Sequence, residues 1–283
     1  MGSNFIFFGT PRISEILLEK LIEKDFNPSL VITGEAKSVG RSSTPQPTAI
    51  AALAEKNNIE VATPTSLRIN PEIVEKIKSL KPQFAILSAY GKIIPQEILD
   101  LFPLGILNPH PSLLPKYRGP SPIQTTLLNG ETKTGVSVIL LDNEIDHGPI
   151  LSQKELEIAE DDTQESLTER LGDLSTELII DLIPNLISGT INTQTQDHSI
   201  ATYTQKVSRD SGYFDLDTPP DNLNNMIRAF YPWPGVWTKI DGKILKFLPE
   251  NKVQIEGGKP VTLKEFLNGH PALKEKLQNL KLD

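Results

Sequence analysis

Through the first half of the chain, short apolar runs alternate with stretches in which apolar residues recur at every third or fourth position. The short runs predict buried strands, and the periodic stretches predict helices with one buried face. This alternation is typical of an α/β fold with a mostly parallel sheet covered by helices on both faces. The predicted strands are Asn4–Phe8, Leu30–Thr33, Phe84–Ser88 and Gly105–Asn108, and the predicted helices include Thr48–Asn57 and Pro71–Leu80.

The middle of the chain predicts two more strands and one long helix. The strands, Thr134–Leu141 and Pro149–Glu157, flank the turn-rich stretch DNEIDHG at 142–148. The helix begins near Thr163, and its leucines recur at three- and four-residue spacing, which is typical of one buried face. These leucines are Leu167, Leu171, Leu174, Leu178 and Leu182. We interpret the acidic side chains around them as a solvated outer face.

The composition changes after residue 187, where Thr, Gln, Ser and Asn become frequent, as is typical of a linker. Beyond this stretch, one short helix and several short strands predict a small β-rich domain. The helix is Leu223–Phe230, and the strands are Trp237–Ile240, Ile244–Phe247, Val253–Ile255 and Val261–Leu263. We therefore expect an α/β domain over 1–187, a linker over 188–206 and a second domain over 207–283.

Composition and charge narrow the possible functions. The 283 residues contain no cysteine, which excludes disulfides, thiol catalysis and metal sites built from cysteine. A formal charge of −8 argues against nucleic-acid binding by bulk charge. However, residues 142–187 alone hold 2 basic and 13 acidic side chains, so the rest of the chain is slightly basic. A local cationic contact with nucleic acid is therefore compatible with the sequence.

The densest cluster of candidate chemistry lies between residues 108 and 122, where prolines restrict the backbone around an amide and an imidazole. In an extended segment Asn108 and His110 project to the same side. An imidazole exchanges protons near neutral pH, and an amide donates a hydrogen bond to an oxygen that gains negative charge. A proline-braced structural turn with a capping histidine is the alternative.

Asp146 is the second candidate, because a carboxylate in the turn between two strands can reach His110 and stabilise its cation. Asp142, Glu144 and His147 are its neighbours, so an Asp-rich turn without catalytic chemistry is the alternative. A metal site formed by His110, Asp146 and His147 is disfavoured, because adjacent residues rarely ligate one ion together. We expect no metal.

Other common sites are absent from the sequence. The turn Gly9-Thr10-Pro11 lacks the glycines of a dinucleotide-binding loop, and no P-loop, HExxH or GxSxG motif occurs. The polar stretch 34–46 contains Lys37 and Arg41, which are candidates for contacts with phosphate. A solvated surface loop is the alternative reading of this stretch.

Six segments together resemble those of methionyl-tRNA formyltransferases, within the folate-dependent formyltransferase family. The Asn-x-His and SLLP block with the downstream aspartate is specific for the folate-dependent enzymes, and FFGTP and PWPG narrow the resemblance to those that act on tRNA. The segments are FFGTP at 7–11, AYGKIIP at 89–95, NPHPSLLPKYRGPSPIQ at 108–124, LDNEIDHGPIL at 141–151, TYTQKVS at 202–208 and IRAFYPWPGVWT at 227–238.

This resemblance implies a Rossmann-like domain that binds 10-formyltetrahydrofolate, followed by a small, shortened OB-like β-barrel that helps to hold tRNA. The implied reaction transfers the formyl group to the α-amine of initiator methionyl-tRNA. The implied residues are Asn108, His110 and Asp146 for catalysis, Ser112, Leu113, Leu114 and Pro115 for folate, and Lys37 and Arg41 for tRNA. We expect a cytoplasmic monomer with no membrane partner.

Two other enzymes with similar active-site blocks are alternatives: glycinamide ribonucleotide formyltransferase and a sugar-nucleotide N-formyltransferase. The first normally ends soon after its Rossmann domain, so residues 207–283 argue against it. The second agrees better with the short C-terminal region. A protein that binds tRNA or folate without turnover is disfavoured, because all three catalytic-type residues are present.

Overall fold

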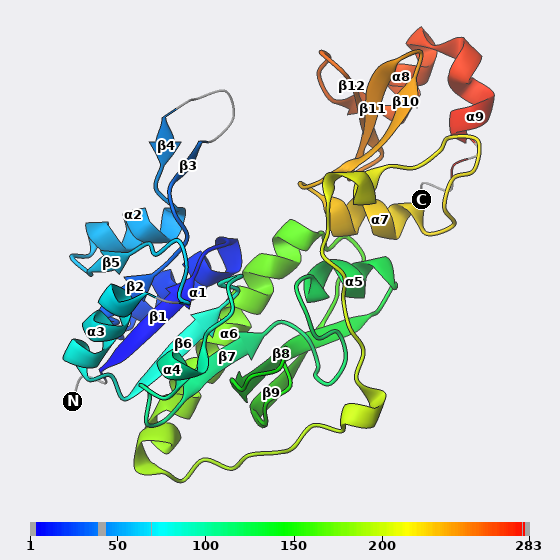
Figure 1. Ribbon diagram of the computed structural model, residues 1–283. Coiled ribbons are helices and arrows are strands. Elements are labelled where there is room, and N and C mark those ends of the chain that lie inside the picture. Colours follow the sequence, from blue (N-terminus) through cyan, green and yellow to red (C-terminus); the bar gives the residue numbers. More distant parts are fainter. Residues whose placement is uncertain (1–3, 39–43, 69, 279, 281–283) are drawn as a thin grey trace. The chain divides into compact units, whose positions relative to one another are not determined.

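The computed structural model describes residues 4–38, 44–68, 70–278 and 280 of the 283-residue chain. These residues form two compact units, which we describe separately (Figure 1). The first unit comprises residues up to 120 together with 134–156 and 168–203, and the second comprises 121–133, 157–167 and the chain from 204 onward. The domain limits expected at 187 and 207 stay predictions.

The first unit is built on a seven-stranded sheet with the strand order β5-β2-β1-β6-β7-β8-β9. The strands run parallel from β5 to β7, and β8 pairs antiparallel with β7. This arrangement confirms the predicted parallel-rich α/β, Rossmann-like sheet. The strands are β1 (Phe5–Gly9), β2 (Leu30–Ile32), β5 (Val61–Ala62), β6 (Phe84–Ser88), β7 (Ile106–His110), β8 (Lys133–Leu140) and β9 (Ile150–Glu157).

Helices cover both faces of this sheet (Figure 1). Alternate strand residues, such as Ile6 and Phe8, pack against α3 (Pro71–Leu80) and α4 (Gln96–Leu99) on one face. The intervening residues point to the other face, where the rings of Phe5 and Phe84 stack with centroids 5.3 Å apart. The helices α1 (Arg12–Glu23) and α6 (Gln164–Ser188) lie there, and α2 (Ala49–Lys56) contacts α1.

The 25-residue helix α6 buries the leucine face that the sequence predicts. The five leucines of this face are between 0% and 7% exposed. Gly172 lies against Ile16 of α1, where an added Cβ would approach the Ile16 side chain to 2.8 Å, so the two helices pack closely. No helix in the described ranges has the length and apolar character needed to cross a membrane.

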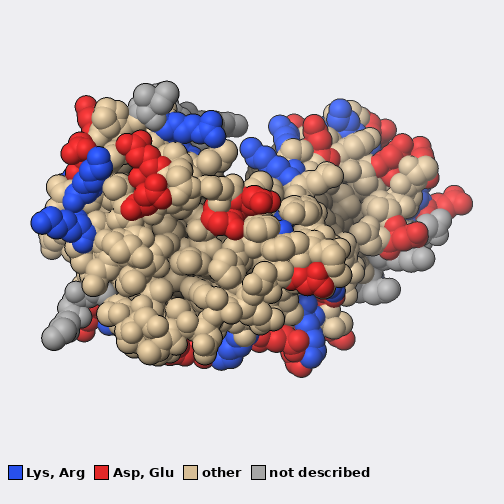
Figure 2. Space-filling view, turned by 60° about the horizontal axis from the view of Figure 1, so that its bottom comes forward, with Lys and Arg blue, Asp and Glu red and all other residues tan. Residues whose placement is uncertain are grey.

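The outer face of α6 is acidic and solvated, as the sequence predicts. Three of its carboxylates form exposed ion pairs: Glu169 with Arg12 at 2.8 Å, Asp173 with Lys20 at 2.9 Å, and Glu177 with Lys154 at 2.6 Å. Figure 2 shows this kind of mixture on the face it displays, where acidic and basic side chains lie close to one another. The acidic excess of residues 142–187 is therefore partly balanced by neighbouring cations.

The second unit combines helices with a small antiparallel sheet of order β10-β11-β12-β13. Its helix α5 (Pro122–Leu128) packs against α7 (Leu223–Phe230), although many residues separate them in sequence. The four strands agree with the predicted shortened β domain. Its strands and other α-helices are β10 (Val236–Ile240), β11 (Lys243–Leu248), β12 (Lys252–Ile255), β13 (Val261–Thr262), α8 (Leu263–Gly269) and α9 (Lys274–Gln278).

One predicted strand is shorter than expected. The sequence predicts a strand over Val261–Leu263, but β13 ends at Thr262. The Thr262 side chain accepts a hydrogen bond from the backbone N–H of Glu265, and the Glu265 carboxylate accepts one from the backbone N–H of Thr262. This capping box starts helix α8 at Leu263, and its Ser/Thr-x-x-Glu spacing is visible in the sequence.

Candidate active site

Strand β7 places two of the predicted catalytic side chains on one side of the sheet. Asn108 and His110 are two residues apart, so they project to the same face, and both are buried, with 6% and 5% of their surfaces exposed. His110 is the last residue of β7. The sequence predicts the end of this strand at Asn108, and the structure extends it by two residues through pairing with Ser137 of β8.

The turn between β8 and β9 brings Asp146 to these two side chains. Oδ1 of Asp146 accepts a hydrogen bond of 3.1 Å from Nδ2 of Asn108. Oδ2 accepts one of 2.8 Å from the backbone N–H of Gly119 and lies 3.5 Å from Nδ1 of His110. The structure thus brings the three residues into one cluster, in which Asn108 and His110 are buried and the Asp146 side chain is 13% exposed, as the Asp146 hypothesis requires.

The partners of His110 determine which ring nitrogen carries hydrogen. Nε2 of His110 lies 2.9 Å from the carbonyl oxygen of Tyr117. A carbonyl oxygen only accepts, so Nε2 must donate. The Nδ1 edge then faces Asp146, and this edge is where the ring can gain or release a proton beside the carboxylate.

Asn108 keeps donor capacity beyond its bond to Asp146. A carboxylate oxygen accepts, so the amide nitrogen, and not the amide oxygen, faces Asp146. This nitrogen carries two hydrogens, and the second makes no hydrogen bond within the part of the chain that the structure describes. The second N–H can therefore bind an oxygen of a substrate.

The loop 112–115 is held rigidly from within the protein. Ser112 is fully buried, and its hydroxyl donates to the carbonyl of Lys116 at 2.7 Å. The backbone N–H of Leu114 donates to Oγ of Ser137, and Nε2 of Gln153 donates to the carbonyl oxygen of Leu114 at 3.0 Å. Leu113 and Pro115 are only half-buried, so the accessible part of this loop is apolar.

The neighbours of Asp146 form their own turn. The backbone N–H of Glu144 donates to Oδ1 of Asp142, and Oδ2 of Asp142 lies 2.7 Å from Nδ1 of His147. Asp142 and His147 therefore pair with each other and not with His110. No group of three or more His, Asp or Glu side chains suited to a metal ion occurs among the described residues.

The predicted tRNA-contacting loop contains a short hairpin of β3 (Lys37–Ser38) and β4 (Pro45–Gln46). Lys37 pairs in register with Gln46. Arg41 lies outside the described residues. The roles of Lys37 and Arg41 stay predictions.

Sequence reasoning missed four residues that contact the cluster directly or through one intermediate. Gly119 and Tyr117 contribute backbone groups, and Gln196 and Arg118 contribute buried side chains. A backbone group leaves no sequence signal. Gln196 lies in the polar stretch interpreted as a linker, where nothing in the local pattern distinguishes it from neighbouring glutamines.

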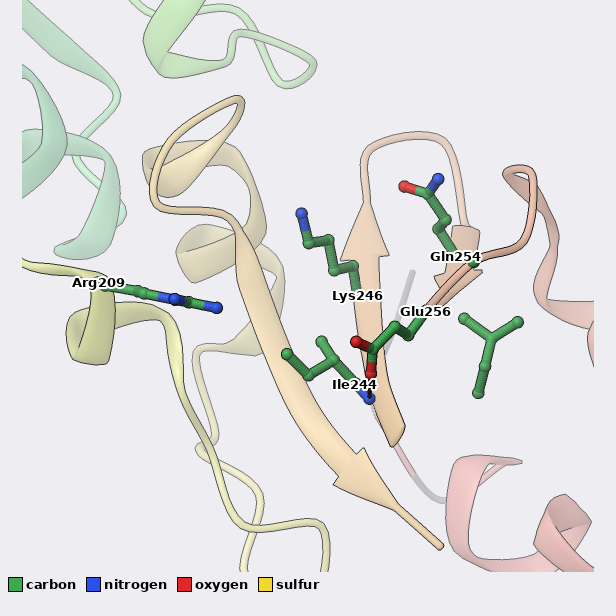
Figure 3. A pocket seen from close by; sticks show the side chains of 7 residues that line it. Arg209, Ile244, Lys246, Gln254 and Glu256 are labelled. Carbon is green, nitrogen blue, oxygen red and sulfur yellow. Dashed lines mark hydrogen bonds between the residues drawn. The ribbon is translucent and has the colours of Figure 1, made fainter. Parts of the chain in front are cut away.

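The second unit contains a hollow of about 280 Å³ beside its small sheet. Figure 3 shows Arg209 extending toward the strands that carry Ile244, Lys246 and Gln254. Glu256 also lines this hollow, and its Oε2 accepts from the backbone N–H of Ile244 at 3.3 Å. Close by in the chain, the rings of Tyr213 and Trp237 lie 4.9 Å apart. The lining thus combines two cations, Arg209 and Lys246, with the carboxylate of Glu256.

The buried Asn-His-Asp cluster on a parallel-rich sheet defines the class of protein. Residues 3–183 match the formyl transferase family, and residues 206–251 match the C-terminal domain of formyl transferases. The chain belongs to the formyl transferase family.

Several methionyl-tRNA formyltransferases are similar in sequence to this chain. The protein of that name from Caldanaerobacter subterraneus subsp. tengcongensis is 35% identical over 255 residues, which cover 90% of this chain and 82% of the relative. The proteins of that name from Thermodesulfovibrio yellowstonii and Thermotoga maritima are 38% and 37% identical, each over 90% of this chain and about four-fifths of their own length.

Solved structures show the same fold. Methionyl-tRNA formyltransferase from Clostridium thermocellum is similar with a TM-score of 0.59 at 20% identity, covering 92% of this chain and 96% of that one. An N-formyltransferase from Helicobacter canadensis, in complex with folinic acid and dTDP-3-aminofucose, is similar with a TM-score of 0.64 at 21% identity. That match covers 93% of this chain and 99% of the other.

Proposed function

We propose that this protein transfers the formyl group of 10-formyltetrahydrofolate to the free α-amino group of initiator methionyl-tRNA, for use in translation initiation. The observation that carries this proposal is the buried cluster of Asn108, His110 and Asp146. The cluster occurs in a chain that matches methionyl-tRNA formyltransferases over about four-fifths of their length. The product is N-formylmethionyl-tRNA.

The geometry supports a distinct role for each side chain. When an amine attacks a formyl carbon, negative charge builds on the formyl oxygen, and the amine must lose a proton. When that oxygen's charge collapses back, the bond from the formyl carbon to N10 of the folate breaks, and N10 takes up a proton and leaves as tetrahydrofolate. Asn108 donates its second N–H to that oxygen, and protonated His110, whose Nδ1 faces Asp146 and whose Nε2 donates to Tyr117, stabilises the oxygen by its positive charge. Asp146 stabilises the histidine cation and assists removal of the amine proton.

The folate loop fits the aromatic part of its proposed ligand. When bound, 10-formyltetrahydrofolate supplies the formyl carbon that the amine attacks. Leu113 and Pro115 present an apolar surface suited to flat rings, while the buried Ser112 and Leu114 keep the loop in shape.

Tyr90 lies buried after β6 with an unpartnered hydroxyl among the described residues. It belongs to the AYGKIIP segment of the family resemblance.

We propose that tRNA is held by two cationic regions. Lys37 and Arg41 belong to the polar stretch 34–46 of the sequence, for which the resemblance implies contact with the acceptor end. Arg209 and Lys246 line the hollow of the second unit (Figure 3), beside the aromatic pair Tyr213 and Trp237.

The protein acts in the cytoplasm as a monomer without a membrane partner in this proposal.

The second candidate is an N-formyltransferase that acts on a sugar nucleotide. The observation that favours it is the shape of the fold, which matches the Helicobacter canadensis enzyme as well as it matches the tRNA enzyme. The catalytic cluster serves either acceptor, because both present a primary amine. The acceptor therefore distinguishes the two functions, and the catalytic residues do not.

An acceptor comparison tests the proposal. Purified protein is supplied with 10-formyltetrahydrofolate and one of three amines: initiator methionyl-tRNA, dTDP-3-aminofucose or glycinamide ribonucleotide. We expect formylation of the tRNA with kcat/KM at least about 10³-fold above that of the other two. Formylation of either small molecule without formylation of the tRNA would make the proposed acceptor wrong.

A further inference from the structure

The side chain of Gln196 connects the turn at Asp146 to the rest of the first unit. Its Nε2 donates to the carbonyl oxygens of Asp146 at 2.9 Å and of Gly148 at 2.7 Å. Its Oε1 accepts from Nε of Arg118 at 3.2 Å and from Nη2 of Arg118 at 2.7 Å. Only 4% of Gln196 is exposed, so these bonds are shielded from water.

Arg118 is buried without an acidic partner. It is 1% exposed, and no carboxylate among the described residues forms an ion pair with it. Its remaining donors reach Nδ1 of His198 at 2.8 Å and the hydroxyl of Tyr203 at 3.3 Å. Removing a guanidinium from water is costly unless its N–H groups are bonded, so these neutral acceptors hold the group in one orientation.

The backbone of Asp146 needs external support. Its φ of 48° lies in the left-handed region, which a residue other than glycine adopts only at a cost. Gly148, two residues further on, packs directly against the backbone of Leu140: an added Cβ at Gly148 would lie 1.8 Å from the Leu140 carbonyl oxygen. Gln196 binds the carbonyls on both sides of this constrained turn. The direction of the Asp146 carboxylate depends on that backbone conformation.

The same segment also supports the loop opposite Asp146. The backbone N–H of Tyr117 donates to Oγ1 of Thr202 at 2.8 Å. The backbone N–H of Arg118 donates to the carbonyl oxygen of Thr202, also at 2.8 Å. Tyr117 in turn accepts the hydrogen bond from His110. Residues 196–202 therefore contact both loops that orient the catalytic side chains.

We infer that Gln196 and Arg118 are positioning residues: the Arg118–Gln196 pair fixes the turn at Asp146 so that its carboxylate meets Asn108, His110 and the Gly119 amide together. The inference rests on the proposed function for its kinetic consequence. Its structural consequence, the orientation of Asp146 toward His110, is independent of the substrate.

Gln196→Glu tests this inference sharply, because the substitution separates the two contacts of Gln196. A carboxylate retains the acceptor for Arg118 and adds a counter-ion, but it removes the donor to the turn. We expect kcat for formylation of initiator methionyl-tRNA to fall about 10- to 100-fold, with KM for both substrates changed less than about 3-fold. We also expect the ring-nitrogen NMR signals of His110 to shift, because its contact with Asp146 changes.

Asp197→Asn is the matched control, because it makes the reverse exchange, a carboxylate for an amide, at the next position. The Asp197 side chain is exposed, and Ser199 is its only hydrogen-bond donor among the residues that the structure describes. We expect this variant to keep the wild-type kcat and the wild-type His110 signals. Arg118→Lys provides a second test, because a lysine retains the charge but cannot bind Gln196, His198 and Tyr203 together, and its kcat should fall as well.

The possible results separate the two proposals. A kcat of Gln196→Glu within about twofold of wild type, unchanged His110 signals, or an equal loss in Asp197→Asn would overturn the positioning role. If wild-type protein does not formylate initiator methionyl-tRNA, the proposed acceptor is wrong. In that case the His110 signals of Gln196→Glu and Asp197→Asn still decide the positioning role.

Discussion

The amide of Asn108 donates a 3.1 Å hydrogen bond to the carboxylate of Asp146, 38 positions further along the chain. The second oxygen of the same carboxylate binds the Gly119 amide and lies 3.5 Å from His110. The Asp146 carboxylate therefore contacts both the amide of Asn108 and the imidazole of His110. The roles proposed for all three residues depend on the charge of this carboxylate.

Replacing Asp146 by Asn tests that dependence. The variant keeps the size of the side chain but loses the charge, and its amide nitrogen has to face a donor, either Asn108 or the Gly119 N–H. We expect kcat for formyl transfer to fall at least about 100-fold. Steady-state kinetics with initiator methionyl-tRNA measure this loss.

Asp142→Asn is the control for that experiment, because Asp142 lies in the same turn and pairs with His147 instead. We expect its kcat to stay within about threefold of wild type. Near-normal activity in Asp146→Asn, or a comparable loss in Asp142→Asn, would contradict the role of Asp146.

Tyr90 provides a prediction about stability. Its hydroxyl is buried without a hydrogen-bond partner among the described residues, and burial raises the pKa of Tyr90 to about 12. The unfolded chain loses this proton near pH 10, so folding stability should decline as the pH rises from about 10 toward 12. Phenylalanine has no proton to lose, so we expect the decline in folding stability between about pH 10 and pH 12 to be smaller in Tyr90→Phe.

At neutral pH, Tyr90→Phe should be as stable as wild type or more stable by up to about 1 kcal/mol, because it removes an unsatisfied buried group. Urea unfolding of both proteins at pH 7 and pH 11 provides the comparison. Tyr213→Phe is the control, because Tyr213 is 45% exposed. A loss of more than about 1 kcal/mol in Tyr90→Phe at pH 7 would show that the hydroxyl has a partner.

The ion pairs of α6 should contribute little to stability. Glu169 bonds Arg12 at 2.8 Å, and this hydrogen bond raises the pKa of the guanidinium, but both side chains are about half exposed. We expect Glu169→Gln to lower the free energy of unfolding by less than about 1 kcal/mol, and the difference to shrink in 1 M salt.

Asp181→Asn is the control for this prediction, because Asp181 is an exposed acid on the same helix. A loss above about 2 kcal/mol that persists in high salt would show that the Arg12–Glu169 pair supports the packing of α1 on α6 and is more than a surface contact.

Periodicity predicted the elements whose side chains repeat regularly. The strand Phe84–Ser88 and the leucine face of α6 follow directly from alternation and from helical spacing. Short elements were harder to predict: β5 has two residues and owes its conformation to pairing with β2, which no local pattern encodes. The contact between α5 and α7 is equally non-local.

The candidate site shows the same division. Asn108 and His110 are two residues apart, so strand geometry alone predicts that they share a face. Asp146 requires tertiary structure, although its position in a turn after a strand made it a candidate. Gln196 was beyond prediction, because its partners at Asp146 and Arg118 are 50 and 78 positions away.

The most direct test of the account is single-turnover transfer of a labelled formyl group from 10-formyltetrahydrofolate to initiator methionyl-tRNA, with enzyme in excess. Wild-type protein, Asn108→Ala and His110→Ala are compared after each variant is shown to be folded. We predict that wild-type protein forms N-formylmethionyl-tRNA and that each substitution slows the transfer step by at least about 100-fold. Absence of product with wild-type protein, or transfer by either variant at nearly the wild-type rate, would contradict the account.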